Sequence, residues 1–267
     1  MERTKKYEYL DDYLLKIRSK GRFTFTFDEL NQTFDSSEQA IRRKLYRLKT
    51  DNKIAIIRKD FYVVLPPEYA QSGSLPLYLY IDDLMNYLRR DYYLCLYTAA
   101  ALHGAAHQQP MGYQVIVRSP MRAIIEKNAQ IIFFVKKTWE QEGIVKKKTA
   151  AGYFNVSSPE LTALDLMSFN GKIGGISRIV PILEDLLKEI KPSRMYKIAS
   201  GYKQVSSLQR LGYLFDKVFN RKDLAAPIKR ALKHKTTQTI LLSISSPKFR
   251  TIDRDWQVDV NVIIEHD

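Results

Sequence analysis

The stretch that decides the fold is Ser36-Ser37-Glu38-Gln39-Ala40-Ile41-Arg42-Arg43-Lys44-Leu45-Tyr46-Arg47-Leu48-Lys49, followed by a short hydrophobic hairpin over residues 54–65. Ile41, Leu45 and Leu48 recur at helical spacing, which predicts a helix with one buried stripe. The other side chains of this helix are mostly cationic and would face outward. A basic helix followed directly by a hairpin is typical of a winged helix-turn-helix, in which that helix suits the major groove of DNA.

The preceding residues predict the rest of such a domain. Residues 9–17 carry an apolar stripe, and Ser19-Lys20-Gly21 ends this first helix. Two further helix starts are predicted from capping boxes, in which a Ser or Thr side chain and a Glu or Gln three residues later satisfy each other's backbone N–H groups. The boxes pair Thr26 with Glu29 and Ser36 with Gln39. Lys59-Asp60 is the predicted tip of the hairpin.

A domain boundary is expected near residues 66–76. Pro66-Pro67 cannot continue a sheet ladder, and residues 71–74 are small and flexible. We therefore expect a winged helix-turn-helix domain over residues 1–70 and a larger domain over residues 71–267.

The larger domain mixes both kinds of element. Helices are expected over residues 81–90, 93–107, 159–169, 176–190, 208–219 and 224–232. Strands are expected over residues 113–118, 131–136, 144–147, 153–157, 239–244 and 256–264. Ser158 should cap the helix that begins with Pro159, and Pro181 should fall within the first turn of its helix. No regular alternation of strand and helix is visible, so the predicted class is α+β.

The composition indicates which binding partners and which cellular compartment to expect. Lys and Arg outnumber Asp and Glu by 43 to 29, a net charge of +14 that favours a polyanion, nucleic acid before membrane. The single cysteine, Cys95, lies in an apolar run, so we expect a buried, inert thiol and no disulfide framework. Neither a signal peptide nor a membrane span is predicted, which favours the cytoplasm.

The basic helix and the hairpin supply the candidate DNA contacts. Arg can grip guanine edges with two hydrogen bonds, and Lys and Arg also neutralise phosphates. The residues predicted to contact DNA are Ser37, Gln39, Arg42, Arg43, Tyr46, Arg47, Arg58 and Lys59. Arg58 and Lys59 are expected at phosphates rather than bases. Two alternatives remain at this point: a solvated charged face, or a winged helix that binds protein.

A second basic surface is conceivable in the larger domain. Its residues would be Lys136, Lys137, Lys146, Lys147, Lys148, Lys229 and Arg230. Trp139 follows the first pair of lysines and could stack on a base. Solvated strand ends explain the same pattern equally well.

Signals for catalysis are few. His103 and His107 have the four-residue spacing of metal ligands on a helix, but no carboxylate completes the set, so packing or capping is the preferred role. Asp253, Asp255 and Asp259 resemble the carboxylates that hold Mg²⁺ in nucleotidyl transfer, although no glycine-containing turn precedes them. We expect no catalytic residues, no metal and no cofactor. Residues 171–175 lack the ending of a phosphate-binding loop and read as a turn between helices.

Three blocks of the chain together resemble a known family. The first is the basic helix with the hairpin that ends Arg58-Lys59-Asp60-Phe61-Tyr62-Val63. The second is Tyr93-Leu94-Cys95-Leu96-Tyr97-Thr98-Ala99-Ala100-Ala101-Leu102-His103-Gly104. The third is Phe154-Asn155-Val156-Ser157-Ser158-Pro159-Glu160-Leu161-Thr162-Ala163-Leu164-Asp165-Leu166, followed by Gly171-Lys172-Ile173-Gly174-Gly175. In this order they resemble AbiEi-type antitoxins, the antitoxin and transcriptional-regulator halves of abortive-infection toxin–antitoxin systems of type IV.

The resemblance implies a bacterial phage-defence function. It implies a repressor that binds inverted repeats in its own promoter as double-stranded DNA, with two copies, as a homodimer, meeting a two-fold-related site. It also implies a functional partner, a toxin similar to nucleotidyltransferases. One departure is Asp60 at the hairpin tip, where many members of the family have glycine.

Two other classes of function remain open on the sequence. One is a nucleotidyltransferase-like, metal-dependent enzyme that uses the three aspartates. The other is an RNA-binding regulator whose larger domain carries the basic surface.

Overall fold

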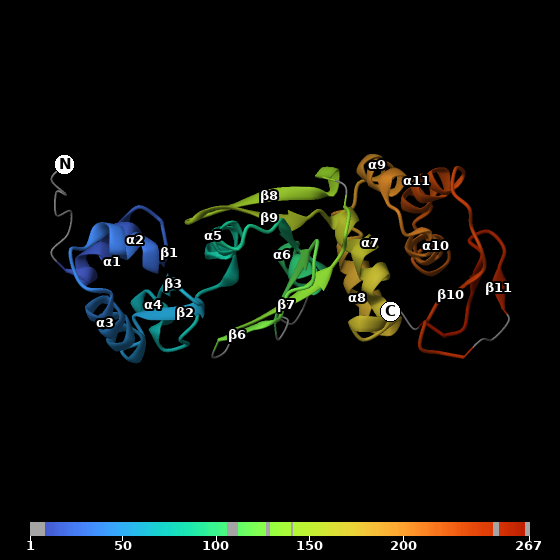
Figure 1. Ribbon diagram of the computed structural model, residues 1–267. Helices are drawn as coiled ribbons and strands as arrows, with labels where there is room; N and C mark the ends of the chain where they lie inside the picture. Colours follow the sequence, from blue (N-terminus) through green and yellow to red (C-terminus); the bar gives the residue numbers. More distant parts are fainter. Residues whose placement is uncertain (1–8, 106–111, 127–128, 140, 248–250, 265–267) are drawn as a thin grey trace. The chain divides into compact units, whose positions relative to one another are not determined.

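A computed structural model of the 267-residue chain describes residues 9–105, 112–126, 129–139, 141–247 and 251–264 (Figure 1). Helices and several sheets make a mixed α+β fold, as the sequence predicts. The chain divides into two compact units. Unit 1 comprises Met1–Tyr92, Met111–Val135 and Lys146–Asn155, and unit 2 comprises Tyr93–Pro110, Lys136–Val145 and Val156–Asp267.

Unit 1 begins with three helices and a three-stranded antiparallel sheet (Figure 1). The elements are α1 (Leu10–Ser19), β1 (Thr24–Thr26), α2 (Phe27–Thr33), α3 (Glu38–Thr50), β2 (Ile54–Arg58) and β3 (Phe61–Val64). The strand order is β1-β3-β2. Apolar side chains from all three helices and from the sheet share one core, with Phe25 and Leu30 fully buried at its centre. The predicted helices and hairpin are therefore present.

The helix starts confirm one predicted capping box and correct the other. Thr26 and Glu29 form the predicted capping box at the start of α2. The box predicted for Ser36 and Gln39 is wrong, because Ser37 caps α3 and its hydroxyl accepts a hydrogen bond from the backbone N–H of Ala40 at 3.3 Å. The choice between adjacent serines depends on which one is extended while the next residue is helical, and the sequence alone does not fix this.

The remaining elements of unit 1 follow the hairpin or return from later in the chain. They are α4 (Pro67–Ala70), α5 (Ile81–Tyr87), β5 (Tyr113–Val117), β6 (Ile124–Glu126) and β7 (Ala129–Val135). The predicted hairpin of β8 (Ile144–Thr149) and β9 (Gly152–Ser157) has its tip in unit 1. A Cβ at Gly21 would lie 2.6 Å from the carbonyl oxygen of Ala150, so glycine permits this close approach. Residues 71–92 belong to unit 1, and independent folding of residues 1–70 stays a prediction.

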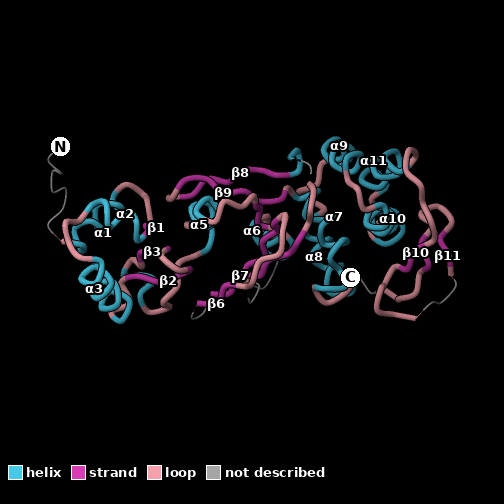
Figure 2. The backbone as a smooth tube through the Cα atoms, viewed as in Figure 1, coloured by secondary structure: helices cyan, strands magenta, loops and turns pink. Residues whose placement is uncertain are grey.

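Unit 2 is built mainly from helices. They are α6 (Leu96–Leu102), α7 (Pro159–Phe169), α8 (Ile176–Leu186), α9 (Pro192–Gly201), α10 (Val205–Tyr213), which continues into a π-helical turn over Leu214–Val218, and α11 (Lys222–Leu232). Helix α7 is central, because α6, α8, α9 and α10 all contact it. Short strands β10 (Ile240–Leu241), β11 (Ile252–Asp253) and β12 (Val258–Asp259) lie within long loops near the C-terminus (Figure 2).

The helix predicted from Tyr93 onward starts later than expected. Residues Tyr92–Leu94 form strand β4, and Leu94 pairs in parallel with Val156 of β9. A short apolar run of this kind fits a buried strand as well as a buried helix, so its period does not distinguish them. Cys95 is extended between the two elements and fully buried, which confirms the expected buried thiol.

Three further predictions need correction. Pro181 is the sixth residue of α8 rather than part of its first turn, so one backbone hydrogen bond is missing inside the helix. Only Val258–Asp259 of the strand predicted over residues 256–264 pairs with neighbours. Helix α9 was not predicted, although Pro192 at its first position is a favourable start signal.

Candidate functional site

One face of α3 concentrates exposed polar and aromatic side chains. Because Ile41, Leu45 and Leu48 are buried, the intervening residues point away from the core. Gln39, Arg43 and Arg47 are exposed, and Tyr46 is 73% exposed, which is unusual for a large aromatic side chain. An open groove along the helix is lined by Glu38, Gln39, Arg42, Arg43, Tyr46 and Arg47. Four of the predicted DNA contacts therefore lie together with Arg42 on one accessible helix face.

Ser37 and Arg42 are exposed but already have partners within unit 1. Ser37 is used as the cap of α3. The guanidinium of Arg42 donates from Nη1 to Asp60 Oδ1 at 3.2 Å and lies over the ring of Phe27, with Cζ 3.8 Å from the ring centroid. Its side chain keeps 50% of its surface exposed, so it can still contact a ligand.

The two hairpin residues differ in availability. Lys59 is exposed at the turn. Arg58 is half-buried, because β2 packs against β6 and Arg58 Nη2 donates to the carbonyl of Arg122 at 3.0 Å. The Nε atom of Arg58 is buried without a hydrogen-bond partner among the described residues. Lys59 is thus the more accessible of the two predicted phosphate contacts.

The residues of the conceivable second basic surface are divided between the units. Lys146, Lys147 and Lys148 follow one another on β8 in unit 1, where Lys146 and Lys148 are the exposed pair. Lys136, Lys137, Lys229 and Arg230 belong to unit 2. Lys137 is exposed. Lys136, Lys229 and Arg230 make contacts within unit 2 through their charged groups.

These contacts in unit 2 occupy the charged groups. Lys229 donates to the carbonyl of Asp255 at 2.7 Å, and the guanidinium of Arg230 lies 3.4 Å from the ring centroid of Tyr196. The expectation that Trp139 could stack on a base is wrong, because its side chain is only 8% exposed and packs edge-on against Tyr93.

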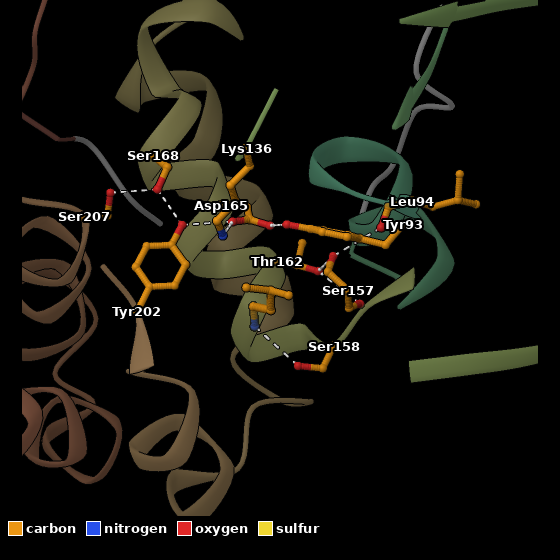
Figure 3. Close-up of polar contacts among 11 residues, drawn as sticks. Tyr93, Leu94, Lys136, Ser157, Ser158, Thr162, Asp165, Ser168, Tyr202 and Ser207 are labelled. Atoms are coloured by element: carbon orange, nitrogen blue, oxygen red, sulfur yellow. Dashed lines mark hydrogen bonds and ion pairs between the residues drawn. The ribbon is translucent and has the colours of Figure 1, made fainter. Parts of the chain in front are cut away.

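A buried polar network that the sequence did not reveal surrounds Asp165 of α7 (Figure 3). The carboxylate is fully buried and accepts hydrogen bonds from Tyr93 Oη at 2.8 Å, Tyr202 Oη at 2.9 Å and Lys136 Nζ at 2.7 Å. Ser168 extends the network to Tyr202 and Ser207. Three donors on one carboxylate offset the cost of removing its charge from water.

The network also fixes the protonation of the two tyrosines. Burial, followed by the nearby negative charge of Asp165, holds the pKa of Tyr93 and the pKa of Tyr202 well above the ordinary value. Both hydroxyls therefore remain donors at neutral pH. One signal in the sequence was the helix over residues 159–169, whose apolar residues fall on no single face, which is typical of a helix buried on all sides.

The three aspartates of the enzyme alternative do not converge. In an antiparallel ladder, paired residues point to the same face and their neighbours to the opposite face. Asp253 pairs with Val258, so Asp253 and Asp259 lie on opposite faces. The hydrogen bond from Lys217 lowers the pKa of Asp255, which also approaches Lys229. This arrangement removes the support for a shared metal site.

Of the two histidines, only His103 lies among the described residues. His103 follows α6, and its Nε2 lies 2.7 Å from the carbonyl oxygen of Ser157, which agrees with the expected packing role. His107 lies outside the described residues. Within the described ranges, His, Cys, Asp and Glu side chains form no group of three or more suited to a metal ion.

The geometry defines a class: a two-unit α+β protein with an exposed cationic helix in one unit and a helical second unit around a buried carboxylate. Residues 92–217 match the AbiEi antitoxin C-terminal domain. Over these residues the chain is similar to that family, which confirms the expected resemblance to AbiEi-type antitoxins. An AbiEi antitoxin domain supports the role of an antitoxin in a toxin–antitoxin pair, with a toxin as partner.

A solved structure shares the architecture. The crystal structure of the RV2827C protein from Mycobacterium tuberculosis superposes with a TM-score of 0.65 at 15% identity, covering 93% of this chain and 89% of that chain. At this identity the likeness concerns the fold. No curated protein matches the chain. Among the described residues, no helix has both the length and the apolar character needed to cross a membrane.

Proposed function

We propose that this protein is an antitoxin that also represses transcription from its own promoter by binding inverted repeats in double-stranded DNA. In this proposal, residues 1–70 are a winged helix-turn-helix, α3 is its recognition helix and β2–β3 is its wing. Two copies meet a two-fold-related operator in the cytoplasm, and the pair of antitoxin and toxin acts in phage defence. The partner toxin is nucleotidyltransferase-like, as the resemblance implies.

The observation that carries the DNA-binding half is the exposed face of α3. A recognition helix needs side chains that can reach base edges without breaking contacts within the protein. Arg43, Tyr46 and Arg47 meet this requirement because all three are exposed. Arg43 and Arg47 form no ion pair among the described residues. The helix has its own cap and a complete apolar stripe, so its outer face contributes little to folding and remains available for binding.

The order of elements supports the winged form of the motif. Helix α2 and helix α3 are separated by a short connection, and the β2–β3 hairpin follows α3 with exposed Lys59 at its turn. In such folds the second helix of the pair enters the major groove while neighbouring elements contact phosphates. The excess of basic residues over the whole chain assists binding to the phosphate backbone.

The test compares two double variants of the full-length protein on DNA from its own upstream region. Arg43→Ala with Arg47→Ala should lose preference for this DNA over a scrambled duplex, because two groups that face the groove are removed. Lys188→Ala with Lys191→Ala removes the same charge from exposed positions of unit 2 and should keep the preference. Fluorescence anisotropy at two salt concentrations measures both affinities.

The control separates base recognition from general electrostatic attraction. Equal losses in the two double variants, on both duplexes, would contradict the assignment of α3 as the recognition helix. Binding of single-stranded or structured RNA that exceeds binding of the upstream duplex would instead favour the RNA-binding alternative.

A further inference from the structure

A pair of opposite charges links α3 to the turn of the β2–β3 hairpin. Arg42 Nη1 lies 3.2 Å from Asp60 Oδ1, and the guanidinium carbon lies 3.8 Å from the centroid of the Phe27 ring. Phe27 itself is buried, at 3% exposed. Arg42 is therefore fixed by two contacts of different kinds while half of its side chain still faces solvent.

The position of Asp60 is set by the backbone of the turn. Its φ of +59° falls in the left-handed region, which Asp tolerates better than most residues. The carbonyl of Asp60 accepts a hydrogen bond from the backbone N–H of Phe27 at 3.0 Å, and the carbonyl of Lys59 accepts one from Tyr87 Oη at 3.1 Å. These bonds hold the turn in place, so the carboxylate is presented to Arg42 from a fixed point.

The contacts of Arg42 with Phe27 and Asp60 involve the face of its guanidinium and its Nη1 atom. Stacking on the Phe27 ring sets the plane of the guanidinium, and the hydrogen bond from Nη1 to Asp60 sets its rotation within that plane. The hydrogen bond to Asp60 uses Nη1, so Asp60 does not engage the Nε and Nη2 donors. Two parallel N–H groups of Arg are the donors that grip the O6 and N7 atoms of guanine.

We propose that Asp60 is a positioning residue for sequence readout: it orients Arg42 to grip a guanine edge in the major groove. This inference rests on the proposed function, since it concerns how α3 reads DNA. The carboxylate also repels phosphates at the turn, so it opposes binding in the wrong register.

The experiment uses Asp60→Gly in the full-length protein. Glycine fits the positive φ of the turn, so the backbone should be kept, and far-UV circular dichroism with a thermal melt checks this. The ratio of affinities for the upstream duplex and a scrambled duplex should fall by about tenfold, because Arg42 loses its orientation. The affinity for the scrambled duplex should rise, because one negative charge has been removed.

A double-mutant cycle with Arg42→Ala tests whether Asp60→Gly changes the affinity ratio through Arg42. In an Arg42→Ala background, Asp60→Gly should leave the affinity ratio unchanged. A rise of both affinities by the same factor in the single variant would overturn the inference, since Asp60 would then act by charge alone. A fall in the ratio that persists in the Arg42→Ala background would overturn it as well.

The same measurements distinguish this inference from the proposed function. A wild-type protein without any preference for the upstream duplex contradicts both. A wild-type protein with a clear preference that Asp60→Gly does not reduce contradicts only the role of Asp60.

Discussion

The polar side chains of α3 face solvent, whereas those of α7 are buried in the core of its unit. In α3 they point outward from one apolar stripe, and Tyr46 is 73% exposed. In α7 they point inward, and Asp165 is fully buried among Tyr93, Tyr202 and Lys136. The first arrangement leaves donors free for a partner, whereas the second uses every donor within the protein. Polar residues on a helix therefore indicate binding in one case and internal architecture in the other.

The largest effect on stability is expected at Asp165. Asp165→Asn keeps the volume but replaces one acceptor oxygen with a donor, which leaves Lys136 and a tyrosine hydroxyl without a full partner in the core. Breaking a buried charged pair of this kind costs about 3–5 kcal/mol. Chemical denaturation of the variant measures the loss. Glu189→Gln, at an exposed carboxylate of the same unit, is the matched control and should change stability by less than about 0.5 kcal/mol.

The same network predicts a loss of stability in alkali. Because burial raises the pKa of Tyr93 and the pKa of Tyr202, both are neutral in the folded protein at a pH where unfolded tyrosine ionises. Their contribution is complete below about pH 10, the ordinary pKa of tyrosine, and is lost as the pH rises further. Denaturation midpoints between pH 8 and pH 11 should fall less steeply in Tyr202→Phe. Parallel slopes for variant and wild type would contradict this account.

The two helix caps give a smaller, graded comparison. Ser158 caps α7 from a buried position and also donates to Glu160, whereas Ser37 caps α3 from an exposed position. Replacing a capping serine with alanine costs about 0.5–2 kcal/mol. Ser158→Ala should lie near the upper end and Ser37→Ala near the lower end, because water replaces the lost partner only at the exposed cap. Thermal unfolding of the two variants measures the order, and a reversed order would refute it.

The smallest effect on stability belongs to the outer face of α3. Arg43→Ala with Arg47→Ala should change the free energy of unfolding by less than about 0.5 kcal/mol, because both side chains are exposed. This is the variant expected to lose preference for upstream DNA. A destabilisation of several kcal/mol would mean that these arginines serve the fold.

The contrast also explains what the sequence could predict. One apolar stripe on a helix identifies both its buried face and its exposed face. The predicted contacts on α3 do share the exposed face. A capping pattern or a hairpin is equally local, so α2 and the β2–β3 hairpin were predicted. The pairing of Arg42 with Asp60 was missed, because the two residues are 18 positions apart and no periodic pattern joins them.

The buried network lay beyond such reasoning. Its members come from separate segments: Tyr93 lies in β4, Lys136 follows β7, Tyr202 follows α9, and Asp165 belongs to α7. The sequence of each segment does not indicate which polar side chains will form hydrogen bonds with one another. The strand at Tyr92–Leu94 was missed for a related reason: a short apolar run takes its form from the strand it pairs with, here Val156 of β9.

The central claim, that α3 reads DNA in a sequence-specific manner, is tested most directly by footprinting the purified protein on its own upstream region. The experiment is run at two salt concentrations with an excess of nonspecific competitor DNA. The account predicts protection of an inverted repeat that survives the competitor at both salt concentrations. Binding that disappears with competitor and protects no defined sequence would contradict it.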